Sequence, residues 1–567
     1  MVEGAELAEQ VRPTTHRRLA LSLLFVGLVA LAVAWIGDPR AASFSDAGAR
    51  LATTKTMAAA GHWAPDLGYW AADVDPSGAH HAILFAQPHD DQWVAVPSLP
   101  LVVAGRPLWQ LGGARAAVLL PVLSVVLAAY AARRLSRWAS QGDGWLAFWF
   151  VGLLSPVLFY GADFWEHAPA LALGLLAVAL VLEGGMRKVL VGGAIAGLAV
   201  AMRNDMFATF AALGVAALVV PEERRRCGQR WRELAAGCAA LISVVFANSV
   251  VEHFVLAPGT GSARAGGRVS ILGAQLADRL RDAVITSVGV LANDYWLALA
   301  IGAVIGLGIL LLAAGAADRS GEASMPGVVG AIVAWGGMAW RFATFGVSTV
   351  PGFLCAAPVA ALGFFGERTR REQVLFVGSL IAIPTVWMTE WVGGHAPQWG
   401  GRYLLLPTSL LIVLAASQVS RLGARPLVIA LLGLSAAMSV VGVVWHIDRT
   451  RSVARFAEDV MAVPNDVVII GDQPWMGSEI GTWYGDRRFL SARAEDHDPN
   501  DADPEDVVTV VGVARRAGAT EIDVIDSDSH ALDRIDENPK YDGFRFESVR
   551  TTKFLWTDVV IRRYVAV

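Results

Sequence analysis

The chain has 567 residues, of which 55% are hydrophobic and only 17% are charged, and its mean hydropathy is +0.48. Soluble domains carry about 25% charged residues, so this composition excludes an ordinary soluble enzyme. Residues 447–567 hold 15 Lys and Arg against 24 Asp and Glu, whereas residues 1–446 hold 31 against 27. We therefore expect an apolar, basic body joined to an acidic, water-soluble tail. All three cysteines lie in the body, which leaves no disulfide framework and no Cys-based metal site.

Runs of about 17 to 25 apolar residues predict helices that cross a bilayer. Thirteen such runs occur between residues 19 and 446, which predicts a polytopic α-helical membrane domain. The expected spans are residues 19–36, 112–131, 145–161, 168–183, 189–203, 206–220, 234–256, 295–316, 326–345, 351–366, 373–392, 403–420 and 426–446.

The orientation of these spans follows from the excess of Arg and Lys in alternate connections, which is typical of the cytoplasmic side. Residues 1–18 are then a cytoplasmic tail, and an odd number of spans places residues 447–567 outside, in the periplasm or its equivalent. We interpret 19–36 as a retained helix, because no small-residue cleavage site follows it in residues 37–40. The basic run 224–232 lies between two spans, so it indicates a cytoplasmic anchor and not a nucleic-acid site.

The first outer loop, residues 37–111, contains a helix pattern that ends at Gly61. A serine before the apolar run predicts an N-cap, and the glycine predicts a C-terminal stop. One mostly apolar face is predicted from the spacing of Phe44, Ala47, Leu51, Thr54 and Ala58. We therefore expect a helix along the membrane surface, and a second such stretch over Val94–Leu111.

The tail has the pattern of a small α/β domain outside the membrane. Strands are predicted at Asp466–Gly471, Glu521–Ile525 and Trp556–Tyr564, with a helix at Val507–Gly518. The acidic run 494–506 predicts a solvated loop. Calcium binding there is the less favoured alternative, because the spacing lacks the glycine and terminal glutamate of an EF-hand.

Ionisable and polar residues gather at the predicted outer ends of the spans, where an unpaired charge would be costly. They are Asp46, Glu166, His167, Arg203, Asp205, Arg341, Arg402 and Tyr403. Each alone could be a snorkelling or capping residue. Carboxylates beside guanidinium groups at one boundary instead indicate a site that combines proton transfer with phosphate binding.

A metal site in the first outer loop is the alternative offered by His62, His80, His81 and His89. Their spacing matches no common ligand pattern, so solvated loop histidines are the favoured interpretation.

The layout resembles the GT-C superfamily of polyprenyl-phosphate-sugar glycosyltransferases, closest to aminoarabinose transferases and protein O-mannosyltransferases. The resemblance covers nearly the whole chain and is supported locally by three stretches. These are Ser45-Asp46 followed by Met57–Trp63, the span end Ala196–Asp205, and the entry helix Trp399–Pro407. One departure is that many relatives have two adjacent acids in the first loop, whereas Asp46 is followed by Ala47.

The resemblance implies transfer of a hexosyl or pentosyl group from a lipid-phosphate donor to a hydroxyl of an envelope glycan, lipid or protein, with inversion. Asp46 would be the catalytic base, with Glu166 as the candidate for a second acid. Arg203, Arg402 and Tyr403 would bind the donor phosphate, so no cofactor and no metal is required. Glu166, His167 and Asp205 would orient sugar or acceptor hydroxyls. Pocket shape, which no motif encodes, decides the donor sugar.

Two other classes remain as alternatives. A transporter or flippase predicts charged or Gly/Pro-interrupted spans at mid-membrane in two related halves, whereas these span interiors are largely free of charge. A membrane anchor whose tail binds wall polymer leaves the acidic first loop unexplained.

Overall fold

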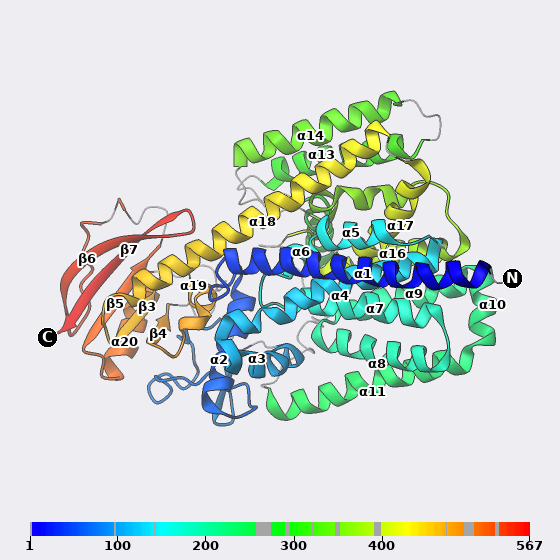
Figure 1. Ribbon diagram of the computed structural model, residues 1–567. Coiled ribbons are helices and arrows are strands. Elements are labelled where there is room, and N and C mark those ends of the chain that lie inside the picture. Colours follow the sequence, from blue (N-terminus) through cyan, green and yellow to red (C-terminus); the bar gives the residue numbers. More distant parts are fainter. Residues whose placement is uncertain are drawn as a thin grey trace.

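The computed structural model describes residues 3–84, 86–95, 98–140, 142–256, 274–289, 295–318, 323–345, 352–389, 399–423, 425–471, 473, 475–492, 504–527, 532–533 and 535–567. Figure 1 shows a body of long, roughly aligned helices with a sheet domain at one end. The first half of the body contains α1 (Glu3–Ile36), α4 (Leu119–Ser140), α5 (Trp145–Leu153), α6 (Val157–Tyr160), α7 (His167–Glu183), α8 (Met186–Met202), α9 (Asp205–Val219), α10 (Pro221–Gln229) and α11 (Trp231–Val255). The second half contains α12 (Ala274–Val288), α13 (Tyr295–Ala317), α14 (Met325–Phe345), α15 (Phe353–Ala356), η2 (Pro358–Phe364), α16 (Arg370–Thr389), η3 (Arg402–Leu404), α17 (Leu405–Leu422) and α18 (Pro426–Met461).

Within the described residues each predicted span overlaps helical structure, although 112–131 includes the junction of α3 and α4, and the number of crossings is not confirmed as thirteen. Among the described residues, seven helices are long and apolar enough to cross a membrane, or eight if α9 and α10, which meet at 102°, form one span. The expected spans 145–161 and 351–366 are each broken, into α5 and α6 and into α15 and η2. Proline explains both breaks, because Pro156 and Pro358 lie where the second piece begins, and proline lacks the N–H of a helix interior.

The first outer loop forms α2 (Ser45–Ala60), a hairpin of β1 (Gln87–His89) and β2 (Gln92–Val94), and α3 (Leu99–Ala117). The predicted stop at Gly61 is confirmed, with φ of 76°. The predicted serine cap is wrong: Phe44 occupies the N-cap position, and no side chain caps the helix.

The helix α2 is buried on two faces instead of lying on a lipid surface. Ala47 and Leu51 pack into the core of the helical body, whereas Ala49 and Ala52 pack into the core of the sheet domain. Small side chains make this double contact possible. At Gly48 a Cβ atom would lie 1.7 Å from the carbonyl oxygen of Ser478, so only glycine allows this approach.

The C-terminal domain contains a five-stranded sheet in the order β4-β3-β5-β7-β6. Its strands are β3 (Val467–Ile470), β4 (Arg488–Ser491), β5 (Glu521–Asp526), β6 (Phe544–Phe554) and β7 (Thr557–Ala566), with α19 (Trp475–Glu479), η4 (Gly481–Trp483) and α20 (Pro504–Arg516) between them. β4 and β5 are parallel to β3, and β7 runs antiparallel to both β5 and β6.

The predicted α/β class of this domain is confirmed, with strands and a helix close to the expected positions. The two edge strands were not predicted, because β4 is short and β6 alternates buried and exposed residues without an apolar run. Residues 494–503 of the acidic run lie outside the described residues. The helix α18 continues past the predicted boundary at residue 446 and packs against β6.

The sheet domain is tied to the body by a buried ion pair beside α2. Arg449 on α18 donates to Oε1 of Glu479 at 2.5 Å and also contacts the carbonyl oxygen of Ser43. The backbone N–H of Ser43 donates to Asp163 at 3.0 Å. Burial raises the pKa of the Glu479 carboxyl to about 7 and that of Asp163 to about 6. These contacts fix the start of α2 between the two parts of the molecule.

The arrangement leads to a test of orientation, because the first outer loop and the tail share one hydrophobic core and must lie on the same side of the membrane. In a cysteine-free background, His62→Cys and Asp542→Cys should react with a membrane-impermeant maleimide in intact spheroplasts. Arg225→Cys, on the exposed face of α10, should react only after lysis. Labelling of residue 225 from outside would contradict the orientation.

Candidate functional site

A carboxylate and a guanidinium meet where the sheet domain joins the body. Asp46 lies in the first turn of α2, and its Oδ2 is 3.6 Å from Nη1 of Arg402 in η3. The Asp46 side chain is 34% exposed and that of Arg402 is 12% exposed. The acid predicted as base is therefore accessible to a substrate, beside a mostly buried cation.

Arg402 is positioned by the turn that precedes it. The hydroxyl of Tyr160 donates to the carbonyl oxygen of Trp399 at 2.7 Å and accepts from its N–H at 3.1 Å. Gly401 then has φ of 62°, and a Cβ there would lie 2.5 Å from the carbonyl oxygen of Thr286. The Trp399-Gly-Gly-Arg402 stretch thus folds as a glycine turn that directs the arginine toward α2.

A second guanidinium, Arg203, lies at the C-terminal end of α8 with three of the predicted residues around it. Its Nε donates to Asp205 at 2.7 Å, and its Nη1 lies 3.4 Å from Glu166. Nη1 also lies 3.0 Å from Nε2 of His167 and must be the donor, because a guanidinium has no acceptor. These contacts hold Arg203 in one direction.

Tyr403 connects the two arginines. The carbon Cζ of Arg203 lies 5.0 Å from the centre of the Tyr403 ring, and Cζ of Arg402 lies 4.8 Å from it. Arg402 also donates to the Tyr403 hydroxyl at 2.9 Å. The structure therefore brings seven of the eight outer-end residues, those to which the family resemblance gives a role, into one connected cluster. The eighth, Arg341, is buried on α14, with its guanidinium 5.4 Å from the centre of the Phe342 ring.

Arg50 belongs to this cluster and was not predicted. It lies one turn after Asp46 on α2, is 5% exposed, and has its Nε 2.7 Å from Oε2 of Glu166. Glu166 thus lies between two guanidinium groups and is itself 4% exposed. An arginine four positions after Asp46, on the same side of the predicted helix, was the available signal.

The ion pairs of the cluster balance in formal charge. Three arginines face three carboxylates, and Glu166 and Asp205 are both held by Arg203. The Trp165 ring lies next to Arg402, whose Cζ is 5.7 Å from the centre of that ring. Asp46 and Arg402 are the most exposed charged side chains of the cluster, so an incoming substrate reaches them first.

Two of the four histidines of the first outer loop, His80 and His81, have structural contacts. His80 and His81 are buried, so the prediction that all of these loop histidines are solvated is wrong for these two. His80 contacts the carbonyl oxygen of Ser491, and His81 lies 2.9 Å from the hydroxyl of Tyr484. Within the described part of the chain, no group of three or more His, Cys, Asp or Glu residues is placed to hold a metal ion.

Comparisons with known proteins found matches among solved structures only. No family model and no curated protein matches the sequence. The chain is similar to ArnT from Cupriavidus metallidurans in the apo state, with 16% identity, 97% of this chain and 98% of that chain covered, and a TM-score of 0.43. It is also similar to the apo oligosaccharyltransferase of Archaeoglobus fulgidus, with 12% identity, 91% and 70% coverage, and a TM-score of 0.44.

A further similar structure is the Archaeoglobus fulgidus oligosaccharyltransferase AglB in complex with an inhibitory peptide and a dolichol-phosphate. Identity is 11%, coverage is 90% of this chain and 69% of that chain, and the TM-score is 0.40. ArnT and AglB are both GT-C superfamily members. At these TM-scores the reaction has to be inferred from the chain's own site.

Proposed function

We propose that the chain is an integral-membrane glycosyltransferase. It moves a sugar from a polyprenyl-phosphate donor to a hydroxyl of a cell-envelope glycan, lipid or protein, with inversion at the anomeric carbon. The observation that supports this is the juxtaposition of an accessible carboxylate, Asp46, with two guanidinium groups on either side of Tyr403. The site lies at an end of a strongly apolar helical body, where a lipid-linked phosphate would be presented.

Asp46 acts as the general base. An acceptor hydroxyl is a poor nucleophile until its proton is removed, and a positioned carboxylate removes it as attack begins. The acceptor oxygen forms a bond to the anomeric carbon, and the bond from that carbon to the phosphate oxygen breaks. The proton goes to Asp46 and the electron pair to the departing polyprenyl phosphate.

Arg402 and Arg203 stabilise the leaving group. The donor is a phosphodiester with one negative charge, and the released phosphate monoester has a second charge to accommodate. Guanidinium groups bind phosphate oxygens in a bidentate manner, and preorganised cations are most effective where charge develops. Tyr403 accepts a hydrogen bond from Arg402 and is the third proposed ligand of the phosphate. Two arginines supply the charge, and we propose that no divalent metal is required.

Donor binding has to open the contact between Asp46 and Arg402. Inverting displacement places the base and the leaving group on opposite faces of the anomeric carbon, as the separated carboxyl groups of inverting glycosidases illustrate. A distance of 3.6 Å leaves no room for a sugar between Asp46 and Arg402. The donor phosphate therefore draws Arg402 toward Arg203, which releases the Asp46 carboxylate for the acceptor.

Glu166, His167 and Asp205 position Arg203. Asp205 is 3% exposed and His167 is 1% exposed, and both contact Arg203 directly. Such buried side chains favour a role in holding the guanidinium over the sugar-orienting role that the family resemblance implies. Glu166 is buried as well and is paired with Arg50 and Arg203. The accessible Asp46 therefore remains the base.

The cellular place of this reaction is part of the proposal. The alternation of arginine-rich connections supports a bacterial plasma membrane protein with a cytoplasmic N-terminus and an extracytoplasmic C-terminal domain. The bilayer is then a binding partner of the body, and the donor approaches through it. Nucleic acid is not among the proposed partners.

Replacing either arginine tests the phosphate site. Arg203→Gln and Arg402→Gln should each weaken binding of a polyprenyl phosphate by about 1.5 to 3 kcal/mol, the scale of a lost charge-assisted hydrogen bond. Arg545→Gln, on the exposed face of β6, is the matched control and should bind as the wild type does. The measurement is equilibrium binding of a labelled polyprenyl phosphate to the purified protein. Unchanged affinity in both site variants would remove these residues from the site.

A further inference from the structure

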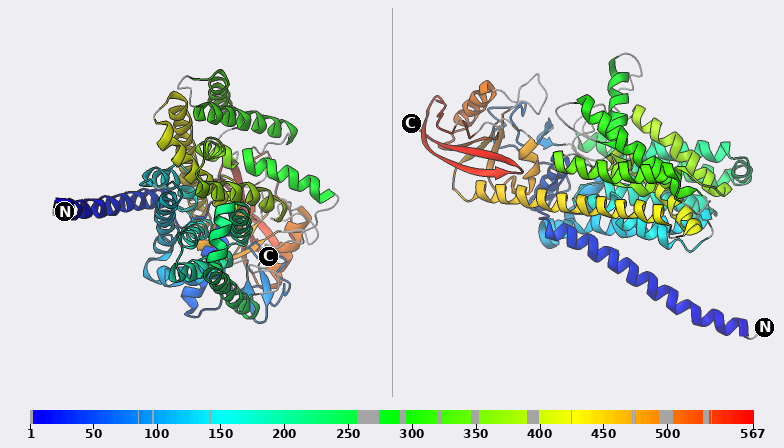
Figure 2. Two further views of the ribbon diagram at one scale, coloured as in Figure 1. Left: turned by 90° about the vertical axis from the view of Figure 1, so that its right-hand side faces the viewer. Right: turned by 90° about the horizontal axis from the view of Figure 1, so that it is seen from above.

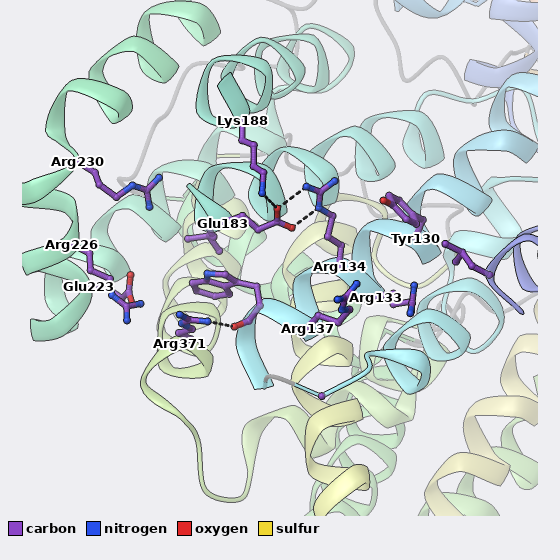
Figure 3. A pocket seen from close by; sticks show the side chains of 14 residues that line it. Tyr130, Arg133, Arg134, Arg137, Glu183, Lys188, Glu223, Arg226, Arg230 and Arg371 are labelled. Carbon is purple, nitrogen blue, oxygen red and sulfur yellow. Dashed lines mark hydrogen bonds and ion pairs between the residues drawn. The ribbon is translucent and has the colours of Figure 1, made fainter. Parts of the chain in front are cut away.

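A strongly cationic pocket lies at the opposite end of the helical body from the candidate site. It encloses about 930 Å³ and is lined from α1, α4, α7, α8, α10 and α16. Figure 3 shows its basic side chains directed toward a common space. Seven Arg or Lys side chains line it against two carboxylates, Glu183 and Glu223, so the lining has an excess of five positive charges.

The two carboxylates are already engaged by part of this set. Glu183 accepts from Arg134 at 2.6 Å and from Lys188 at 2.8 Å. Glu223 accepts from Arg226 at 2.5 Å. A third lining cation, Arg230, pairs with Glu233 outside the lining at 2.9 Å. The uncompensated charge therefore lies on the remaining arginines.

Three of those arginines have no carboxylate partner within the described part of the chain. Arg133 is 8% exposed; its Nε donates to the carbonyl oxygen of Asp143 at 3.2 Å, and its guanidinium lies 4.1 Å from the Trp145 ring centre. Arg371 donates to the carbonyl oxygen of Trp138 at 2.9 Å. Arg137 is exposed, and no hydrogen bond or ion pair joins it to another described residue. Cations held close together repel one another, and a bound anion relieves this repulsion.

The position of the pocket indicates the source of that anion. It lies between helices of the membrane body at the arginine-rich end, which faces the cytoplasmic leaflet in the proposed orientation. Tyr130 and Trp138 add aromatic rings to the lining, which are typical of the membrane interface. On the C-terminal side of Leu19, the helix α1 exposes Leu21, Leu24 and Phe25, each more than half accessible. An acyl chain can pack against these side chains.

We propose that this pocket binds the phosphate head group of an anionic phospholipid from the cytoplasmic leaflet. Basic pockets between spans on this side suit lipid phosphates, and a guanidinium matches two phosphate oxygens at once. The bound lipid would join α1 to α4 and α16. This matters for α1, whose C-terminal part packs against the body whereas its N-terminal part diverges from it in Figure 2. The proposal is independent of the reaction at the other end.

The test uses the purified full-length chain in detergent, with lipid adducts counted by native mass spectrometry. Dioleoylphosphatidylglycerol should bind the wild type at least several-fold more tightly than dioleoylphosphatidylcholine. Arg137→Gln combined with Arg371→Gln should weaken binding of the first lipid by about tenfold and leave the second unchanged. Arg224→Gln combined with Arg225→Gln is the control, since it removes the same charge from the exposed face of α10 outside the pocket.

Each outcome decides for or against the proposal. Equal loss in both double variants would show general attraction to surface charge and overturn a specific pocket. Unchanged binding in the pocket variant would overturn it as well. If inorganic phosphate or glycerol 3-phosphate displaces the lipid at equal concentration, the pocket serves a soluble phosphate and not a lipid. If the double variant does not fold, Arg137→Gln alone removes an exposed side chain with no partner in the described structure and gives the same comparison.

Discussion

Asp46→Asn should reduce sugar transfer by about 10²- to 10⁴-fold while leaving the protein folded and able to bind its donor. Asparagine has the size of aspartate and keeps most hydrogen bonds, but it cannot accept the proton of the acceptor. Donor binding should survive because Arg203 and Arg402 are unchanged. Initial rates and donor affinity measured on the same purified variant separate the two effects.

The structure makes this variant more informative, because no side chain caps the N-terminus of α2. A structural role for Asp46 would consist of a favourable charge at a helix start, worth about 0.3 to 1 kcal/mol of stability. Asp73→Asn, at an exposed position in the same outer loop, is the matched control and should transfer at the wild-type rate. Transfer by a folded Asp46→Asn protein at more than about a tenth of the wild-type rate would exclude Asp46 as the base.

Glu166→Gln should lower the free energy of unfolding by about 3 to 5 kcal/mol, because it removes one partner of a buried charge network. Glu166 lies 2.7 Å from Arg50 and 3.4 Å from Arg203, so its neutralisation leaves two largely buried guanidinium groups without their shared carboxylate. Denaturant or thermal unfolding in detergent measures the change. Transfer should fall as well, because Arg203 loses a contact that directs it.

Two further variants identify the cause of that loss. Glu222→Gln breaks a partly exposed pair with Arg370 at 2.7 Å and should cost less than about 1 kcal/mol. Arg50→Gln combined with Glu166→Gln should be more stable than Glu166→Gln alone, since one uncompensated charge is removed together with its partner. A loss below about 1 kcal/mol for Glu166→Gln would show that water reaches the cluster and that its charges are screened.

The sequence by itself was enough to predict the helical membrane body and to select seven candidate site residues that lie together in the fold. Long apolar runs must form internally hydrogen-bonded helices in a bilayer, so hydropathy locates them without knowledge of their neighbours. Charged and polar residues at the ends of those runs are costly unless they are used, which selected Asp46, Arg203 and Arg402. The convergence of these residues follows because the ends of roughly aligned helices lie at one level of the body.

Only the tertiary structure decided how these residues are paired. Arg50 was missed because its partner Glu166 is 116 positions away, and no local pattern encodes that contact. The double burial of α2 depends on the later Ser478, which approaches Gly48 too closely for any side chain. In the sequence, the apolar face of α2 suggested contact with lipid. In the structure, that face packs against other parts of the protein.

The basic pocket, too, depends partly on the sequence and partly on tertiary packing. Each group of arginines in it is explained from the sequence as an anchor on the cytoplasmic side, because charge next to a span sets orientation. Their convergence depends on α4, α8, α10 and α16 ending at one place, with too few carboxylates to compensate them. Composition determines how many charges lie at an end of the body. Packing between distant segments decides which of them share a partner and which remain to bind one.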